Sequence, residues 1–488
     1  MLKKLVKIVM VYLVLCGILL QGIVFAMGYK MVQLVGPDVH SVPTLFVLFS
    51  DILDKNSKLY RPLSGFLRSS ADSLKTPVYF WQSFDRHNFP SLTYPIDNAP
   101  QTPLGLDRLY VNSEEQLIDA IKKAEAGTEI IVDSGTYRFK KRRIASTRNG
   151  GTANQPIVLR AAVPGEVTIE SATVEGIVVE KPYWQFEGLR FVGVCSHDNR
   201  CEHALHVVGE AANTRIVNNE FVDFNAAIKV NESNGDYPDT GYVGYNDFHN
   251  TRPRETRYSI TPINIDHANE WRVERNVIRN FIKTEGNRVS YGAFMKGGAS
   301  GGVFEGNLVI CNTTKNDYPT YQVGLSAGGG GMKNRRNHVS TETQDLIIRN
   351  NIILHCSDDG VYVNNSKNTV LVNNTLYNTG GISTRFPGTS VVALNNIMTG
   401  EIHQRDGAVG LVEKGNTWLP RSFLTDAEDF DTYFVAPSIG NFTWQALPEN
   451  VETVPLPSEW MSETDFCGNK VFGKSFVGAV SDSANCFY

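Results

Sequence analysis

The chain of 488 residues has no excess of charge of one sign, since 46 Lys and Arg stand against 51 Asp and Glu, for a formal net charge of -5. It therefore lacks the overall basic charge that attracts nucleic acid or an anionic membrane surface, and we expect no nucleic-acid partner. Any electrostatic argument about function must rest on local clusters of charge.

Cys-x-x-Cys spacing, typical of structural zinc sites, is also absent. Apart from Cys16, which lies in an apolar leader, the six cysteines are Cys195, Cys201, Cys311, Cys356, Cys467 and Cys486. An even number in an exported chain favours disulfides. We predict the local pairs Cys195–Cys201 and Cys467–Cys486, although spacing alone does not select the connectivity of six cysteines.

Long apolar runs are absent except for one, from Ile8 to Met27, which follows Lys3, Lys4 and Lys7. The small-residue step Val24-Phe25-Ala26 suits cleavage of a signal peptide, and the same run is long enough to span a bilayer if it is not cleaved. Residues 1–27 are therefore predicted to be a signal peptide or a membrane anchor. The protein is expected to be secreted or periplasmic, or to be attached to the inner membrane.

Sustained helical periodicity is missing from the centre of the chain, where one phrase recurs instead, as in "RIVNNEFVDF", "LIIRNNIILHC" and "TVLVNNTLYNT". Each phrase places an asparagine between two short apolar runs of alternating pattern, which are typical of strands. The asparagines are Asn219, Asn246, Asn276, Asn307, Asn351, Asn374 and Asn396.

Repeats of this length predict a solenoid of stacked coils whose strands pair in parallel. The fold class is therefore predicted to be all-β, a right-handed parallel β-helix, and the protein is expected to be a monomer. Asparagine suits the bends, because it tolerates a left-handed backbone and its amide can bond the amide of a neighbouring coil.

An N-terminal capping helix is predicted over 114–125, since Ser113 and Gln116 form a capping box and the helix is amphipathic. It would cover the open end of the first coil. The predicted division is a leader at 1–27, an N-terminal extension at 28–106, the β-helix at 107–420 and a C-terminal segment at 421–488 that packs on or caps the β-helix.

A polar column is predicted beside the core, because a second strand in each coil alternates apolar and polar residues. If Ile228, Val230, Ile263, Val361 and their equivalents point inward, the outward side chains are Lys229, Asn231, Asn264, Asp266, Lys296, Ser326, Tyr362, Asn364, Ser383 and Arg385. A solvated sheet face would also be polar, so the pattern alone leaves two readings open, a solvated face or a binding site.

Three features favour a binding site. The widest asparagine separation, from Asn307 to Asn351, predicts an inserted loop beside the column, and long loops on rigid scaffolds often hold ligands. Glycines surround Lys296 in "FMKGGASGG" and recur in "GLSAGGGG", where they would let a flat sugar ring approach the backbone. Cations gather here in a chain of negative net charge, as an anionic substrate requires.

Several phrases resemble right-handed parallel β-helix polysaccharide lyases, most of all the chondroitinase B and alginate lyase group. They are "GTEIIVDSGTY", "GGTANQPIVLRAAVPGEVTI", "WQFEGLRFVG" and "TDFCGNKVFGKSFVGAV", and the similarity covers about residues 107 to 482. The resemblance implies β-elimination on a uronic-acid polysaccharide, with a lysine base, an arginine and in some members calcium. The lyases carry a Lys-Ser pair and a later Arg-His-Gly step, whereas Lys296 is followed by Gly297 here, so only the lysine carries over.

β-Elimination needs a neutral base and positive charge on the uronate carboxylate. We assign the base to Lys296, the carboxylate contact to Arg385 or to Arg335 and Arg336, and the proton donor to Tyr362, His267 or His338. The predicted substrate-binding residues are Arg335, Arg336, His338, Asn364 and Tyr321. The oxygens of Asp266, Asn264 and Asn231 are the predicted ligands for Ca²⁺.

Three alternatives stay open. Hydrolysis by paired carboxylates would use Asp358 and Asp359, but the Asn-Thr-Asp, Gly-His-Gly and Arg-Ile-Lys steps of polygalacturonase-type β-helices are absent, so "SDDG" is predicted to be a turn. C5-epimerisation of uronates shares the first proton abstraction with elimination. A non-catalytic carbohydrate-binding envelope protein would use the same groove without chemistry.

Overall fold

The computed structural model describes residues 88–95, 107–313, 320–329, 334–419, 430–447, 451–481 and 486–487. The predicted leader and most of the predicted extension lie outside the described residues, so export, cleavage and membrane attachment stay predictions, as do the domain boundaries. Within the described residues, no helix is long and apolar enough to cross a membrane.

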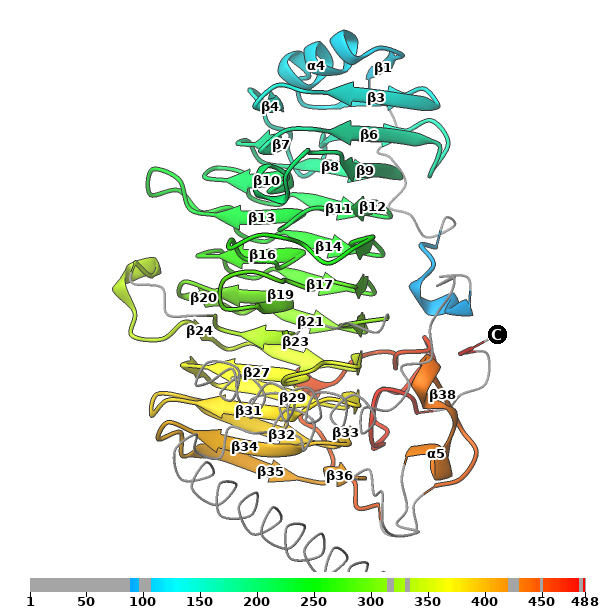
Figure 1. The fold of residues 1–488 in the computed structure, drawn as a ribbon, viewed down its shortest axis with the longest axis vertical. Coiled ribbons are helices and arrows are strands. Elements are labelled where there is room, and N and C mark those ends of the chain that lie inside the picture. Colours follow the sequence, from blue (N-terminus) through cyan, green and yellow to red (C-terminus); the bar gives the residue numbers. More distant parts are fainter. Residues whose placement is uncertain are drawn as a thin grey trace, which may run out of the picture. The chain divides into compact units, whose positions relative to one another are not determined.

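Three parallel sheets wind around one core, and each turn of the chain adds one strand to each sheet (Figure 1). The twelve-stranded sheet contains β1 (Asp107–Val111), β2 (Thr128–Val132), β5 (Ile157–Ala161), β8 (Trp184–Glu187), β11 (Arg215–Val217), β14 (Tyr242–Gly244), β17 (Arg272–Glu274), β21 (Val303–Glu305), β25 (Ile347–Arg349), β29 (Thr369–Val372), β32 (Ser390–Leu394) and β35 (Gly410–Lys414).

The eleven-stranded sheet contains β3 (Gly135–Phe139), β6 (Val167–Ser171), β9 (Leu189–Gly193), β12 (Glu220–Val222), β15 (Asp247–His249), β18 (Val277–Arg279), β22 (Leu308–Ile310), β26 (Ile352–Leu354), β30 (Thr375–Tyr377), β33 (Ile397–Met398) and β36 (Thr417–Trp418). The ten-stranded sheet contains β4 (Arg143–Ser146), β7 (Glu175–Val179), β10 (His203–Val208), β13 (Ile228–Asn231), β16 (Ile263–Asp266), β19 (Val289–Lys296), β23 (Tyr321–Ala327), β27 (Val361–Asn364), β31 (Gly381–Arg385) and β34 (Glu401–Arg405). The predicted all-β parallel β-helix is confirmed.

The remaining elements are short. A three-stranded sheet joins β20 (Ala299–Ser300), β24 (Thr343–Gln344) and β28 (Ser366–Lys367), and β37 (Phe434–Ala436) pairs antiparallel with β38 (Asn441–Trp444). The helices are α4 (Glu114–Lys123) and α5 (Phe430–Tyr433), and 3₁₀ turns cover Pro90–Leu92, Asp198–Arg200, Arg336–His338, Pro437–Ile439 and Ser458–Trp460.

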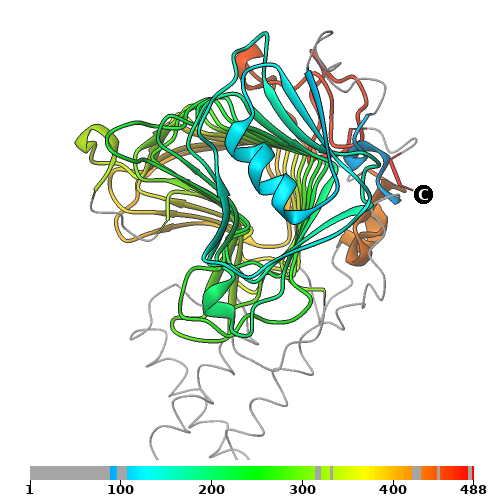
Figure 2. The same cartoon turned by 90° about the horizontal axis from the view of Figure 1, so that it is seen from above.

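Helix α4 lies across the end of the stack (Figure 2). Ser113 is the N-cap and accepts the amide hydrogen of Gln116, as the predicted capping box requires. The Gln116 side chain accepts the amide hydrogen of Asn112, the residue before the N-cap, instead of that of Ser113. Leu117, Ala120 and Ile121 join the core. The helix ends two residues earlier than predicted, at Lys123.

A buried asparagine ladder joins successive coils. Asn276 donates its backbone and side-chain N–H to Oδ1 of Asn307, both at 3.0 Å, and the same pattern links the other predicted asparagines and Asn416. The predicted amide-to-amide stacking is confirmed. The left-handed backbone was assigned to the wrong position, because the residue before each ladder asparagine adopts it, namely Asn218, Tyr245, Arg275, Gly306, Asn350, Asn373 and Asn395.

The C-terminal segment packs on the outside of the coils. Phe430, Phe434 and Phe442 form one apolar cluster with Leu308 and Ile352 of the eleven-stranded sheet. The predicted disulfides Cys195–Cys201 and Cys467–Cys486 are confirmed, and Cys311 pairs with Cys356. The predicted polar column belongs to another sheet, the ten-stranded one.

Candidate functional site

The predicted polar column lies on the outer face of the ten-stranded sheet. All the apolar residues expected to point inward are fully buried: Ile228, Val230, Ile263, Ile265, Val361, Val363 and Ile382. The strand register places Lys229, Asn264, Phe294, Ser326, Tyr362 and Ser383 in one row across neighbouring strands. Asp266 pairs with Lys296, and Asn364 with Arg385, in the next row.

The column is not a solvated sheet face. Asn264, Asp266, Tyr362 and Asn364 are at most 7% exposed, and the side chain of Lys296 is 17% exposed. Polar groups this strongly shielded need partners within the protein or from a ligand. Loops lead into and out of the strands of this sheet at both of their ends.

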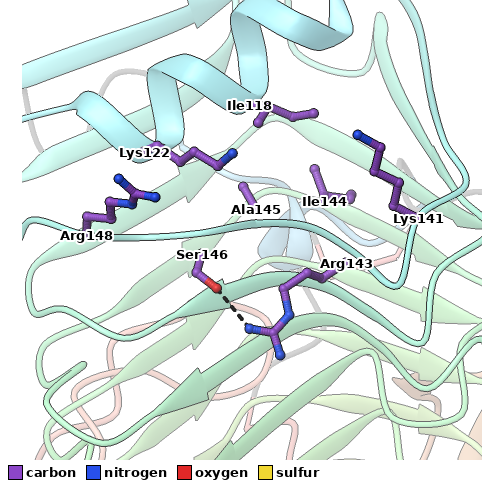
Figure 3. Close-up of a pocket in the computed structure, with 8 residues that line it drawn as sticks. All are labelled: Ile118, Lys122, Lys141, Arg143, Ile144, Ala145, Ser146 and Arg148. Atoms are coloured by element: carbon purple, nitrogen blue, oxygen red, sulfur yellow. Dashed lines mark hydrogen bonds between the residues drawn. The ribbon is translucent and has the colours of Figure 1, made fainter.

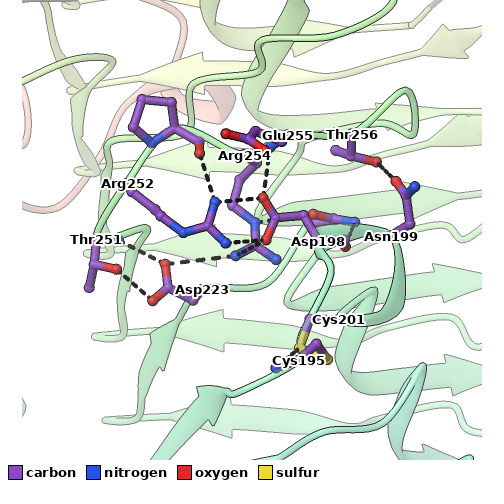
Figure 4. Close-up of polar contacts among 12 residues, drawn as sticks. Cys195, Asp198, Asn199, Cys201, Asp223, Thr251, Arg252, Arg254, Glu255 and Thr256 are labelled. Carbon is purple, nitrogen blue, oxygen red and sulfur yellow. Dashed lines mark hydrogen bonds and ion pairs between the residues drawn. A yellow bond between two sulfur atoms is a disulfide. The ribbon is translucent and has the colours of Figure 1, made fainter.

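On one side of the column, the loops that lead into β10 and β16 are joined by a network of polar contacts (Figure 4). Arg252 donates two hydrogen bonds to Asp198, at 2.7 and 2.8 Å, and buried Arg254 lies 3.1 Å from the same carboxylate. Burial lowers the pKa of Arg254. The Cys195–Cys201 disulfide closes the first loop, so this side of the column is cross-linked both covalently and by charge.

The other side of the column contains the predicted insertion, and its arginines already have carboxylate partners. Arg335 lies 2.9 Å from Glu342, and Arg336 donates two hydrogen bonds to Asp239. His338 is exposed in the same loop. Tyr321 is the first residue of β23 and lies at the opposite end of that strand from the insertion, so the structure does not bring the two together.

The glycines beside Lys296 serve the insertion, so the prediction that a sugar ring approaches the backbone there is wrong for Gly297 and Gly298. Arg336 donates its backbone N–H to the carbonyl of Gly297 at 2.8 Å, and Gly298 donates to the carbonyl of Glu342 at 2.7 Å. A Cβ atom on Gly298 would lie 3.0 Å from the Arg336 nitrogen. Both glycines have positive φ, which fits this close packing.

The centre of the column is a cluster of Lys229, Asp266 and Lys296. Lys229 Nζ contacts one oxygen of Asp266 and donates to Asn264 Oδ1 at 2.8 Å. Lys296 Nζ lies 3.6 Å from the other Asp266 oxygen and 4.4 Å from the ring centroid of Phe294. Burial, opposed by Asp266 and reinforced by Lys296, lowers the pKa of Lys229. Two amines thus share one carboxylate.

These contacts do not fit the prediction that Asp266, Asn264 and Asn231 bind Ca²⁺. Asn264 and Asp266 each direct an oxygen at the Lys229 amine. Asn231 Oδ1 lies 2.8 Å from His206 Nε2 and is hydrogen-bonded to it. A calcium ion needs several oxygens converging on one point, and here two amines stand between them. We derive no catalytic step through calcium.

A second polar cluster lies further along the column. Arg385 donates from Nη1 to the Tyr362 hydroxyl at 3.2 Å and pairs with Asp406, while Ser383 donates to buried Asp359 at 2.9 Å. Burial raises the pKa of Tyr362. Between Lys296 on β19 and Arg385 on β31 lie three strand spacings, about 14 Å in total.

His267 holds the insertion in place. Its Nε2 lies 2.6 Å from the carbonyl oxygen of Asn334, and its ring packs against Gly297. A ring nitrogen that bonds a backbone carbonyl must carry a hydrogen, so His267 uses its Nε2–H to hold Asn334. This arrangement favours a positioning role for His267 over proton donation.

Several residues of the column escaped the sequence analysis, namely Glu175, His206, Phe294 and Arg405, and Asp359 entered it only as a candidate carboxylate for hydrolysis. His206 bridges Glu175, at 3.0 Å, and Asn231. The alternation in "HALHVV" could have revealed His206, but that strand precedes the first asparagine phrase. Asp358 and Asp359 lie in the bend before β27, as predicted, and Asp359 lies 3.8 Å from Arg405.

A different group could hold a metal on the eleven-stranded sheet. Candidate ligand atoms of Glu220, Asp247 and His249 lie within 4.8 Å of one another. Arg190 and Arg279 already bind one carboxylate each, at 2.7 and 3.1 Å. The two arginines neutralise the two acids, so the group offers a metal little net negative charge, and it lies outside the column.

Comparison with known proteins agrees with the resemblance drawn from the opening phrases. A chondroitinase B family profile matches residues 111–241, and no curated protein matches the chain. Among solved structures, an alginate lyase from Paenibacillus sp. str. FPU-7 shares 14% identity and a TM-score of 0.42, over 64% of this chain and 96% of that one.

Pectate lyase Pel9A shares 14% identity and a TM-score of 0.47, over 72% of this chain and 89% of that one. The A-module of mannuronan C-5 epimerase AlgE6 from Azotobacter vinelandii shares 14% identity and a TM-score of 0.40, over 62% and 88%. The family match ends before β16 begins, so it covers neither Asp266 nor Lys296.

Proposed function

We propose that the protein is a polysaccharide lyase that cleaves an anionic, uronic-acid-containing polysaccharide by β-elimination. The observation that carries the proposal is the pair of lysines that share Asp266 on a shielded polar face. Elimination requires a base next to positive charge, and this cluster places two lysine side chains within reach of one carboxylate. The family match over residues 111–241 supports the same class of enzyme.

Lys296 is the proposed base that removes the proton next to the uronate carboxyl group. Lys229 makes the close contact with Asp266 and a hydrogen bond to Asn264, so its amine is committed to oxygen acceptors. Lys296 makes only the longer 3.6 Å contact with the carboxylate, and its Nζ otherwise lies over the Phe294 ring. The Lys296 amine is therefore the one with a lone pair available for a substrate proton once it is neutral.

Lys229 and Arg385 supply positive charge at two points along the column. Lys229, beside the base, would neutralise the carboxylate of the sugar that loses its proton and would stabilise the enolate-like intermediate. Arg385, three strand spacings from Lys296, would hold a carboxylate of another sugar in the same chain. Asn364 lies in the same row and would hydrogen-bond the substrate.

Tyr362 is the proposed proton donor to the leaving glycosidic oxygen. Tyr362 lies on β27, two strands from Lys296 on β19, and its row of paired residues is adjacent to the row that contains Lys296. Because burial raises its pKa, the phenol keeps its proton at neutral and mildly alkaline pH. The Arg385 hydrogen bond fixes the hydroxyl in position.

The test is incubation with a panel of uronate polysaccharides, namely alginate, pectate and chondroitin sulfate, followed by the ultraviolet absorbance of the unsaturated product. Lys296→Ala should lower turnover by about 10²-fold or more, as expected for a missing acid–base group. Lys474→Ala removes an exposed lysine of the C-terminal segment and should leave turnover unchanged. Full activity in a folded Lys296→Ala variant would show that another residue is the base.

Two other outcomes would replace the proposed reaction. Conversion of uronate stereochemistry in the intact polymer, detected by nuclear magnetic resonance without an unsaturated product, would establish an epimerase. Binding of a polysaccharide that stays chemically unchanged would establish a non-catalytic binding protein.

A further inference from the structure

A basic pocket lies between α4 and β4, at the capped end of the stack (Figure 3). It has a volume of about 330 Å³, and Ile118, Ile144 and Ala145 provide its apolar lining. The charged residues of the lining are all cations: Lys122, Lys141, Arg143 and Arg148. A pocket that combines apolar surface with charge of one sign suits a ligand with both a sugar ring and an anionic group.

The charge of this region departs from that of the whole chain. Residues 118–148 hold 8 Lys and Arg against 4 Asp and Glu, whereas the full chain has a net charge of -5. Part of the excess is the run Lys140-Lys141-Arg142-Arg143. Local positive charge on a protein of opposite net charge is the electrostatic pattern expected at a binding site for an anion.

Three of the four cations have no acidic partner of their own. Arg143 lies 2.7 Å from Glu175 and donates to Ser146 at 3.1 Å. Lys122, Lys141 and Arg148 form no ion pair within the part of the chain that the structure describes. Their charges therefore remain available to an anionic ligand.

The pocket lies on the same sheet as Lys296. Strand β4 is the end strand of the ten-stranded sheet, and five strand spacings, about 24 Å, separate it from β19. A line of polar contacts connects the two: Arg143 with Glu175 at 2.7 Å, Glu175 with His206 at 3.0 Å, and His206 with Asn231 at 2.8 Å. The register then leads from Asn231 on β13 to Asp266 and Lys296.

We propose that this pocket is a remote subsite that binds a carboxylate or sulfate group of the same polysaccharide chain, about 24 Å from the base. The inference rests on the proposed function, because it takes its direction along the sheet from Lys296. A polymer lying along the stack contacts the basic pocket at one end and the lysine cluster further on. Long chains therefore bind more tightly than short ones.

The experiment compares a triple variant, Lys122→Ala with Lys141→Ala and Arg148→Ala, with a matched control that removes the exposed Lys414, Lys470 and Lys474. Both are made in the Lys296→Ala background, so that binding is measured without turnover. The probes are long chains and tetrasaccharides of each polysaccharide in the panel, titrated by calorimetry. Circular dichroism confirms that both variants are folded.

We expect the triple variant to bind long chains about tenfold more weakly than the control, since three charge contacts of this kind together are worth about that factor. Tetrasaccharide affinity should not change, because a short chain held at the lysine cluster does not reach the pocket. The affinity loss should shrink at high salt.

Equal affinity of the triple variant and the control for long chains would overturn the subsite, and so would equal losses for long chains and tetrasaccharides. If inorganic phosphate binds the pocket but long chains gain nothing from it, the pocket is a small-anion site and the inference is wrong. If the unaltered protein degrades no polysaccharide but the triple variant still loses long-chain affinity, the lyase proposal fails while the subsite stands.

Discussion

Asp266→Asn tests whether one carboxylate holds the two lysines of the column. The substitution keeps the size of the side chain and an oxygen that can accept from Lys229, but it removes the charge. At 3.6 Å, the contact between Lys296 and Asp266 is a gross attraction of about 4 to 5 kcal/mol at an effective dielectric constant of about 20. Desolvation offsets part of this attraction.

Removing one partner of a buried ion pair typically costs about 3 to 5 kcal/mol, because the other charge stays buried. The two lysine side chains keep 16% and 17% exposure, so we expect the lower end, about 3 kcal/mol at pH 6. Asp266 raises the pKa of Lys229 against the effect of burial, so its loss lowers that pKa further.

The sign of the pH dependence of this stability difference follows from Lys229, whose pKa burial lowers. As pH rises through the folded pKa of Lys229, the buried amine loses its charge, and the variant no longer carries that unpaired ammonium. The difference in unfolding free energy between parent and variant should therefore shrink from pH 6 to pH 10, to about 1 kcal/mol.

Urea unfolding followed by circular dichroism at both pH values measures this difference. Asp345→Asn is the matched control, because Asp345 is exposed and accepts a hydrogen bond from Asn368. It should change stability by less than about 0.5 kcal/mol at either pH. A difference for Asp266→Asn that is small at pH 6, or that does not change with pH, would refute the shared-carboxylate reasoning.

Three further predictions concern the ladder, the proton donor and calcium. Asn307→Ala should lower the urea-unfolding free energy by about 3 kcal/mol, because it leaves the buried backbone N–H of Asn276 without its acceptor and removes the side-chain hydrogen bond to the Val273 carbonyl. Asn416→Ala at the open end should cost less, and equal losses would contradict the ladder argument. Tyr362→Phe should lower kcat on long polysaccharides by about 10²-fold with a nearly unchanged KM, and a change confined to KM would remove Tyr362 as proton donor. Chelation with EDTA should leave both the unfolding midpoint and turnover unchanged, and a loss of either that Ca²⁺ restores would show that the amines yield to the ion.

The repeated phrases were sufficient to predict the coils and the inward face of each strand. Side chains alternate across a strand whatever the strand pairs with, so Ile228 and Val230 identify their own face from local sequence. The asparagine ladder was equally predictable, because an asparagine at the same place in every coil finds its equivalent in the next. The outward set followed from the same alternation.

Which outward residues meet was decided only by the stacking of the coils. Lys229, Asp266 and Lys296 lie on three strands, and only the register between those strands brings their charged ends together. The insertion shows most clearly what local sequence does not predict. Arg336 and Asp239 are 97 residues apart in the chain, and their ion pair engages a cation that the sequence analysis assigned to substrate binding. Local pattern determines the direction of a side chain, but its partner depends on distances that exist only after the coils have packed.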